Sequence, residues 1–182
     1  MRGHTHALFG VTTLTLVYTY TGLFEPTAAS LALCAGTGAV GALVPDLDAR
    51  HSTLKRELGV AGSLASTGLR LAGIKHRGLT HYGLTAGAVL LLAWLLARWL
   101  GHPELGLAFG LGYTSHIVAD GLTYRGVPLL WPVRSRFYLL PRRLRVRTGG
   151  RVEELLFVGI ILLLAWLATE IAPWLVCSSL ST

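Results

Sequence analysis

Five stretches of this chain are about as long and as apolar as a membrane-crossing helix must be, which is roughly 20 residues. They cover about residues 6–24, 28–45, 82–100, 105–121 and 154–175. Lipid offers the backbone no hydrogen-bond partners, so a segment that crosses it alone has to be helical. The sequence therefore predicts an all-α, polytopic membrane helix bundle with about five transmembrane helices, built as a single membrane-embedded domain over residues 1–182.

Composition agrees with a bilayer as the solvent. Hydrophobic residues make up 52% of the chain and charged residues 14%, whereas soluble domains carry about 25% charged residues. The net charge of +7 is compatible with a nucleic-acid-binding protein, but the charges gather between the apolar stretches. That pattern favours a membrane topology signal, and no nucleic-acid partner is expected.

The distribution of Lys and Arg predicts the orientation in the membrane. If the N-terminus lies in the cytoplasm and five spans follow, Arg98 is the single one of the 16 Lys and Arg residues on the outer side. Such a bias is the positive-inside rule. It predicts a multi-pass protein of the inner or plasma membrane with a cytoplasmic N-terminus and a basic cytoplasmic loop, Arg125 to Arg151. Between the second and third spans, Glu57 to Ile74 is predicted to be an amphipathic segment that is either interfacial or re-entrant.

Every predicted span carries ionisable residues at its cytoplasmic end. They are His4 and His6, Asp46 and Asp48, His76 and His81, His116 and Asp120, and Glu153 and Glu154. Any one of them has a simpler interpretation as a helix cap or a hydrogen-bond partner, and this interpretation is kept for His4, His51 and Glu154. Ionisable groups at membrane depth are costly and usually functional, so their joint occurrence on one side predicts a shared site.

The residue types indicate a metal centre. Imidazole nitrogens mixed with carboxylate oxygens suit zinc, manganese or iron, and we expect a divalent ion, with zinc or manganese favoured. His116 and Asp120 are four residues apart and share one helix face. The candidates outnumber the ligands of one tetrahedral ion, which allows two ions bridged by Asp46 or Asp120. The two cysteines, Cys34 and Cys177, form no metal-binding pair and are predicted to be packing residues.

Several sequence blocks, taken in order, resemble the YdjM-type family of predicted inner-membrane metal-dependent hydrolases. The blocks are His6 with Gly10, Leu43 to Asp48 with Ser52, His76 to His81, Gly112 to His116 with Asp120 and Thr123, Gly126 to Pro132, and Glu153. The resemblance implies the metal-site residues His6, Asp46, Asp48, His76, His81, His116, Asp120 and Glu153. One departure is Ala49-Arg50, where the family often has His-Pro.

The function expected from these features is metal-dependent hydrolysis of an ester or phosphoester in an amphiphilic, lipid-like substrate at the cytoplasmic membrane face. Asp46 or Asp48 would bridge metal ions or act as a general base, and Arg77 would neutralise charge that develops on oxygen. Membrane lipids are the expected partners of the basic loop. Two alternatives stay open: a metal-ion transporter and a non-catalytic, metal-stabilised membrane protein.

Overall fold

The computed structural model describes residues 1–22, 27–47, 52–71, 79–130, 133 and 135–180. All regular elements within these ranges are helices, as predicted. The α-helices are α1 (Gly3–Thr21), α2 (Ala28–Leu43), α3 (Thr53–Glu57), α4 (Gly59–Leu71), α5 (Gly83–Trp99), α6 (Pro103–Gly121) and α7 (Arg151–Leu180). Three 3-10 turns complete the set: η1 (Val44–Asp46), η2 (Leu79–His81) and η3 (Arg142–Leu144).

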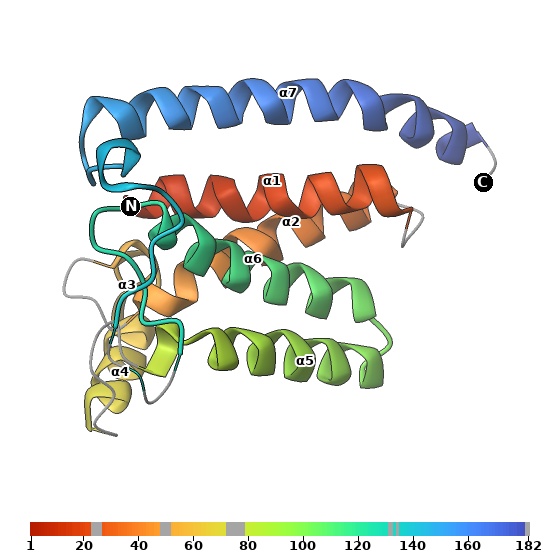
Figure 1. Cartoon of the computed structure of the whole chain (residues 1–182). Helices are drawn as coiled ribbons and strands as arrows, with labels where there is room; N and C mark the ends of the chain where they lie inside the picture. Colours follow the sequence, from red (N-terminus) through yellow and green to blue (C-terminus); the bar gives the residue numbers. More distant parts are fainter. Residues whose placement is uncertain (23–26, 48–51, 72–78, 131–132, 134, 181–182) are drawn as a thin grey trace.

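Helix α6 is the centre of the bundle. It packs against α1, α2 and α5, while α7 lies alongside α1 (Figure 1). Two apolar clusters hold α6 in place: one joins Ala108 to Leu14 of α1, and the other joins Tyr113 to Ala86 of α5. The side chains that α6 carries are therefore surrounded by neighbouring helices along most of its length.

Glycines let α2 and α6 approach until their backbones touch. A Cβ atom on Gly112 would collide with the carbonyl oxygen of Gly38, and one on Gly41 would collide with the backbone of Phe109. Small residues at such crossings are typical of membrane helix pairs. The sequence predicted close packing from the glycines of α2, and Gly38 and Gly41 do lie at the contact, whereas Gly36 faces open space.

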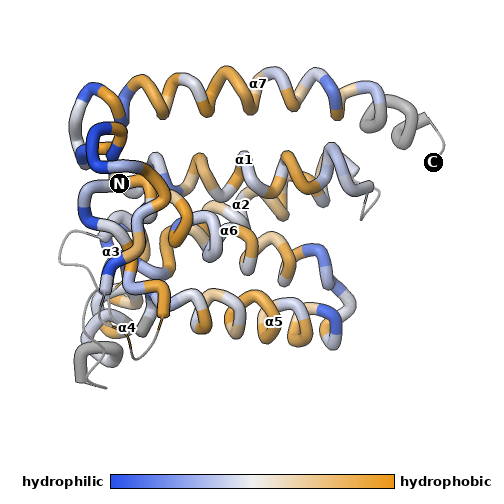
Figure 2. Tube along the Cα trace, viewed as in Figure 1, coloured by the Kyte–Doolittle hydropathy of each residue, from blue (hydrophilic) through white to orange (hydrophobic). Residues whose placement is uncertain are grey.

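Among the described residues, two helical segments are long and apolar enough to cross a membrane by length and composition: Ala28–Asp46 and Arg151–Pro173. Helix α5 is apolar but shorter, and Figure 2 shows apolar residues running along both α5 and α7. Helices α1 and α6 coincide with predicted spans, but their Thr, His and Asp residues lower their hydropathy. The number of five crossings therefore stays a prediction.

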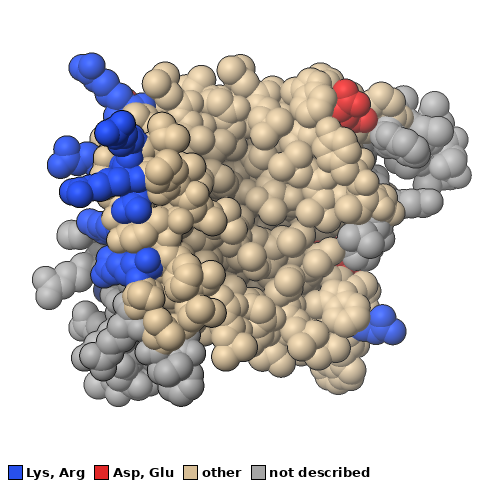
Figure 3. All heavy atoms as spheres, viewed as in Figure 1, with Lys and Arg blue, Asp and Glu red and all other residues tan. Residues whose placement is uncertain are grey.

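Basic side chains gather at one end of the molecule. Figure 3 shows them beside a broad belt without charged residues on the face in view, with one basic residue beyond that belt. Arg98, in the last turn of α5, is at the opposite end of that helix from the metal-site candidates. The N-terminus, α3 and the start of α7 all lie at the basic end (Figure 1).

The segment predicted as one amphipathic stretch, Glu57 to Ile74, begins at the last residue of α3 and contains the whole of α4. Helix α3 begins earlier, at Thr53, because the Ser52 side chain accepts a hydrogen bond from the backbone N–H of Lys55, a favoured N-cap. Gly59 has a φ of 55° and separates α3 from α4. Helix α4 lies at the basic end of the bundle (Figure 1), and residues 72–78 are outside the described ranges.

The basic loop is ordered by short backbone contacts. Isolated bridges join Thr123 to Val146 and Val127 to Phe137. Within the loop, the guanidinium of Arg145 lies 3.5 Å from the centre of the Tyr138 ring, a cation–π contact. The loop thus folds back onto the end of α6, close to the polar residues of that helix.

Candidate metal centre

Five of the predicted ligands converge at the basic end of the bundle. We call His6, Asp46, His81, His116 and Asp120 the His/Asp cluster. His6 lies in the first turns of α1, Asp46 ends η1, His81 ends η2, and His116 and Asp120 lie in the last turns of α6. Residues separated by more than 100 positions in the sequence are thereby brought into one site by the packing of α6 against its neighbours.

The end of α2 shapes one side of the cluster. Pro45 has no N–H and cannot continue an α-helix, so α2 ends at Leu43 and η1 carries Asp46 into the site. The last four carbonyls of a helix lack partners within it. One of them, the carbonyl of Ala42, accepts a hydrogen bond from Nδ1 of His116 at 2.7 Å.

That hydrogen bond determines which nitrogen His116 can offer to a metal. If Nδ1 donates to Ala42, Nε2 carries the lone pair and faces the cluster. His116 Nε2 lies 3.7 Å from Asp46 Oδ1, and the ring stacks on that of His6 with centroids 3.8 Å apart. His116 is therefore held in the orientation and tautomer of a metal ligand.

The other distances between imidazole nitrogens and carboxylate oxygens in the cluster are close to that between His116 and Asp46. His6 Nε2 lies 3.4 Å from Asp120 Oδ1, His81 Nε2 lies 3.6 Å from Asp46 Oδ1, and His81 Nε2 lies 3.9 Å from Asp120 Oδ2. Charge-assisted hydrogen bonds measure about 2.7–2.9 Å, so these contacts are too long to be such bonds. Two ligands held about 2.1 Å from one tetrahedral ion are about 3.4 Å apart, which is close to the observed spacing.

Hydrogen bonding leaves several buried atoms of the cluster without partners. Nε2 of His6, Nε2 of His116 and Oδ1 of Asp46 accept or donate no hydrogen bond within the described part of the chain. Buried polar atoms are normally satisfied, and an exception needs an explanation. Two overlapping triads, His6–His116–Asp120 and Asp46–His81–His116, each place their ligand atoms within 4.8 Å of one another. The donor set therefore fits a divalent cation.

Exposure differs sharply within the cluster. The Asp46 side chain is 25% exposed, whereas those of His6, His116 and Asp120 are 0% exposed and that of His81 is 1% exposed. Among these five residues, Asp46 is the one whose side chain reaches the molecular surface, although its Oδ1, which faces His81 and His116, is buried.

Second-layer contacts orient His81 as well. The Thr80 hydroxyl lies 2.9 Å from Nδ1 of His81, and the Tyr113 hydroxyl donates a 2.6 Å hydrogen bond to the backbone carbonyl of Thr80. Partners of this kind fix the ring orientation of metal-binding histidines. Thr80 and Tyr113 lie within two of the family motif blocks, but nothing in the sequence indicated these contacts or the one made by the Ala42 carbonyl.

Glu153, also predicted as a ligand, is bound by backbone amides. Its buried carboxylate accepts hydrogen bonds from the backbone N–H of Arg2 at 2.6 Å and of Gly149 at 2.5 Å. A carboxylate at a helix N-terminus favours such partners. Glu153 therefore ties the start of α1 to the start of α7 and does not belong to the His/Asp cluster.

Three further predicted residues, Asp48, His76 and Arg77, lie outside the described residues. His4 was given the simpler interpretation, and its ring is indeed directed away from the cluster: it packs edge-on against Phe157 of α7, with centroids 5.1 Å apart. His6 enters the cluster from the same helix because it occupies a different face of α1.

A family model described as YdjM inner membrane protein matches residues 1–176. The chain belongs to this family. The resemblance found in the sequence motifs is thus confirmed, and all five residues of the His/Asp cluster lie within the matched region.

Curated relatives agree with this assignment. An uncharacterized protein of Bacillus subtilis (strain 168), YvsG, is 29% identical over 166 residues, which are 89% of this chain and 91% of YvsG. The inner membrane protein YdjM of Escherichia coli (strain K12) is 42% identical over 60 residues, 31% of this chain and 28% of YdjM. No solved structure matches the chain. These names place the chain among inner membrane proteins and name no reaction.

Proposed function

We propose that this protein is a membrane-embedded, metal-dependent hydrolase that cleaves an ester or phosphoester in an amphiphilic substrate at the cytoplasmic membrane face. The observation that carries the proposal is the His/Asp cluster, in which Nε2 of His6, Nε2 of His116 and Oδ1 of Asp46 lack hydrogen-bond partners within the described residues, and in which the ligand atoms of each triad have the spacing of metal ligands. Zinc or manganese, as one or two ions, suits the mixture of imidazole and carboxylate donors.

A bound divalent ion would polarise the scissile group and lower the pKa of a nucleophilic water. The residues around it have separate roles. His116 and His81 are held in fixed orientations by Ala42 and Thr80, which suits them to hold the ion. Asp46 is the most exposed member of the cluster, and we assign it both metal binding and the general-base role. Asp48 and Arg77 keep the roles predicted for them, as base and as charge-neutralising residue.

The position of the cluster favours hydrolysis over transport. Transporters place their sites near the bilayer midplane, between repeats or broken helices. Here the five ligands occupy helix ends on the basic side of the bundle. A saturated, purely structural metal site is also less favoured, because the Asp46 side chain is 25% exposed and so reaches the molecular surface.

Turnover by purified protein tests the proposal directly. Wild type, Asp46→Ala and a control, His102→Ala, are assayed with water-dispersed lipid phosphoesters in the presence of zinc or manganese. His102 is exposed and precedes α6 at the end of that helix away from the cluster. We expect Asp46→Ala to lower kcat/KM about 100-fold or more and His102→Ala to leave it near the wild-type value. Equal turnover by Asp46→Ala and wild type would exclude the proposed mechanism.

The five-span topology with a cytoplasmic N-terminus is part of the proposal, and labelling can test it. After Cys34 and Cys177 are replaced by alanine, single cysteines are introduced by Arg147→Cys in the basic loop and Trp99→Cys at the end of α5. Both positions are exposed, and they lie at opposite ends of the bundle. We expect a membrane-impermeant thiol reagent to label Trp99→Cys in intact cells and Arg147→Cys only after lysis. Labelling of both positions from one side would reject the topology.

A further inference from the structure

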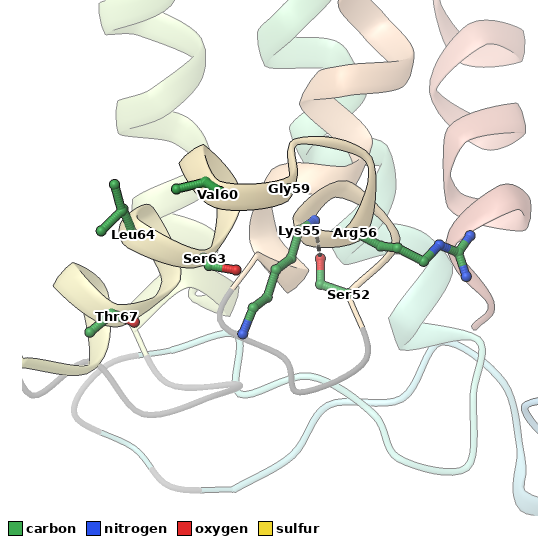
Figure 4. A pocket seen from close by; sticks show the side chains of 8 residues that line it. All are labelled: Ser52, Lys55, Arg56, Gly59, Val60, Ser63, Leu64 and Thr67. Atoms are coloured by element: carbon green, nitrogen blue, oxygen red, sulfur yellow. Dashed lines mark hydrogen bonds between the residues drawn. The ribbon is translucent and has the colours of Figure 1, made fainter.

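A cavity lies at the basic end, between α3 and α4, and none of the residues that line it belongs to the His/Asp cluster. Its volume is about 710 Å³, within the range usual for small-molecule sites. The lining residues are Ser52, Lys55, Arg56, Gly59, Val60, Ser63, Leu64 and Thr67 (Figure 4). Ser52 belongs to one of the family motif blocks but was given no role there, and the other lining residues belong to no block.

The polar part of this lining is suited to an anionic oxygen group. Figure 4 shows the Lys55 side chain passing between Ser63 of α4 and Ser52, with its ammonium group extending beyond both hydroxyls. The Ser52 hydroxyl accepts a 3.3 Å hydrogen bond from the backbone N–H of Lys55. A hydroxyl that accepts one hydrogen bond can still donate its own proton in another. One cation with several hydroxyl donors matches the oxygens of a phosphate.

The apolar part of the lining continues along α4. The Val60 side chain is 77% exposed and that of Leu64 is 69% exposed. Exposed branched side chains directly beside a cationic pocket fit a ligand that is anionic at one end and apolar at the other. A free inorganic anion would not use this apolar surface.

Helix α3 also packs against the helix that carries His6. Thr53, next to the capping residue Ser52, packs so closely on Gly3 of α1 that a Cβ on Gly3 would collide with it. Gly3 lies one helical turn before His6, on the same side of α1. A ligand held by α3 and α4 would therefore sit beside the start of the helix that delivers His6.

We propose that the α3–α4 cavity binds the phosphate headgroup of an amphiphile, with Lys55 pairing the phosphate and Val60 and Leu64 contacting the start of the apolar chain. This inference rests on the proposed function in one respect, because it takes the bound amphiphile to be the substrate of the proposed hydrolase. Binding itself does not require turnover, so the two proposals can fail separately.

The test is direct binding to the full-length protein in a neutral detergent. The probe is dioctanoyl phosphatidic acid, with dioctanoylglycerol as the arm without phosphate and inorganic phosphate as the arm without acyl chains. We expect the first to bind at least 10-fold more tightly than either of the others. Equal affinity for dioctanoylglycerol would overturn the headgroup assignment, and equal affinity for inorganic phosphate would overturn the amphiphile.

Two charge-matched variants locate the binding group. Arg56 adjoins Lys55 on α3, but its side chain extends away from α4 and its guanidinium lies 3.4 Å from Glu57 (Figure 4). We expect Lys55→Gln to weaken binding of dioctanoyl phosphatidic acid about 10-fold, the loss of one charge-assisted bond, and Arg56→Gln to weaken it less than threefold. Ser63→Ala changes the other wall of the cavity, on α4, and should weaken binding of dioctanoyl phosphatidic acid by a smaller factor than Lys55→Gln does. Equal losses for Lys55→Gln and Arg56→Gln would reject the site.

Binding by Asp46→Asn separates this inference from the proposed function. We expect this variant to bind the probe with wild-type affinity while losing turnover. If wild type binds the probe at Lys55 but hydrolyses no phosphoester, the cavity assignment stands and the hydrolase proposal fails. If phosphoesters are hydrolysed but Lys55→Gln binds like wild type, the cavity assignment fails and the hydrolase proposal stands.

Discussion

The variant His116→Ala should lose bound metal almost completely. His116 is the one residue common to both triads of the His/Asp cluster, so its removal weakens every arrangement of ligands that the described residues offer. We expect the divalent metal retained after gel filtration to fall below about a tenth of the wild-type amount, since removing a ligand costs more than the 10- to 100-fold effect typical of second-layer partners. Metal analysis of the purified protein measures this directly.

A matched control separates metal loss from general damage. His102→Ala removes an exposed imidazole that contacts Glu104 at 3.3 Å, remote from the cluster. This variant should keep its metal. A His116→Ala protein that stays folded and retains the full metal content would show that His116 is a structural histidine bound to Ala42, and the metal-centre assignment would have to be abandoned.

The second large effect is expected from Gly112→Val in α6. Even a single Cβ at this position would collide with the carbonyl of Gly38, and a backbone atom cannot move aside as a flexible side chain can. Overpacking typically costs 1–3 kcal/mol, and we expect about 3 kcal/mol or more here because the whole α2–α6 contact must separate. The measurement is the unfolding midpoint of the protein in detergent.

The same variant should also affect the metal centre. Gly112 lies one helical turn before His116, so separating α2 from α6 pulls the His116 ring away from Ala42 and Asp46. The control is Gly36→Ala in α2, where a Cβ meets no atom within 4 Å. Gly36→Ala should be neutral or slightly stabilising, because alanine favours a helix more than glycine does. An unchanged midpoint for Gly112→Val would contradict the backbone contact between the two helices.

Much of the fold follows from local properties of the chain. Helices α1, α2, α5, α6 and α7 lie where the apolar stretches predicted them, because a helix is selected by the hydropathy and backbone chemistry of its own residues. The predicted helix boundaries were less accurate around Gly59. The left-handed backbone of this one residue sets α3 apart from α4, and composition alone does not reveal such a break. The pairing of His116 with Asp120 on one face was also predictable, since it needs only helical periodicity.

The sequence by itself determined the helical class, the membrane-like composition, the family and a set of candidate ligands. Only the tertiary structure decided which candidates meet: the glycine contacts bring α2 against α6 and so place Asp46 opposite His116, while Glu153 is taken up by backbone amides of Arg2 and Gly149. The hydrogen bond from His116 to the carbonyl of Ala42 could not be predicted from the sequence either. A backbone oxygen is present at every residue, and only the packing of two helices distinguishes one from another.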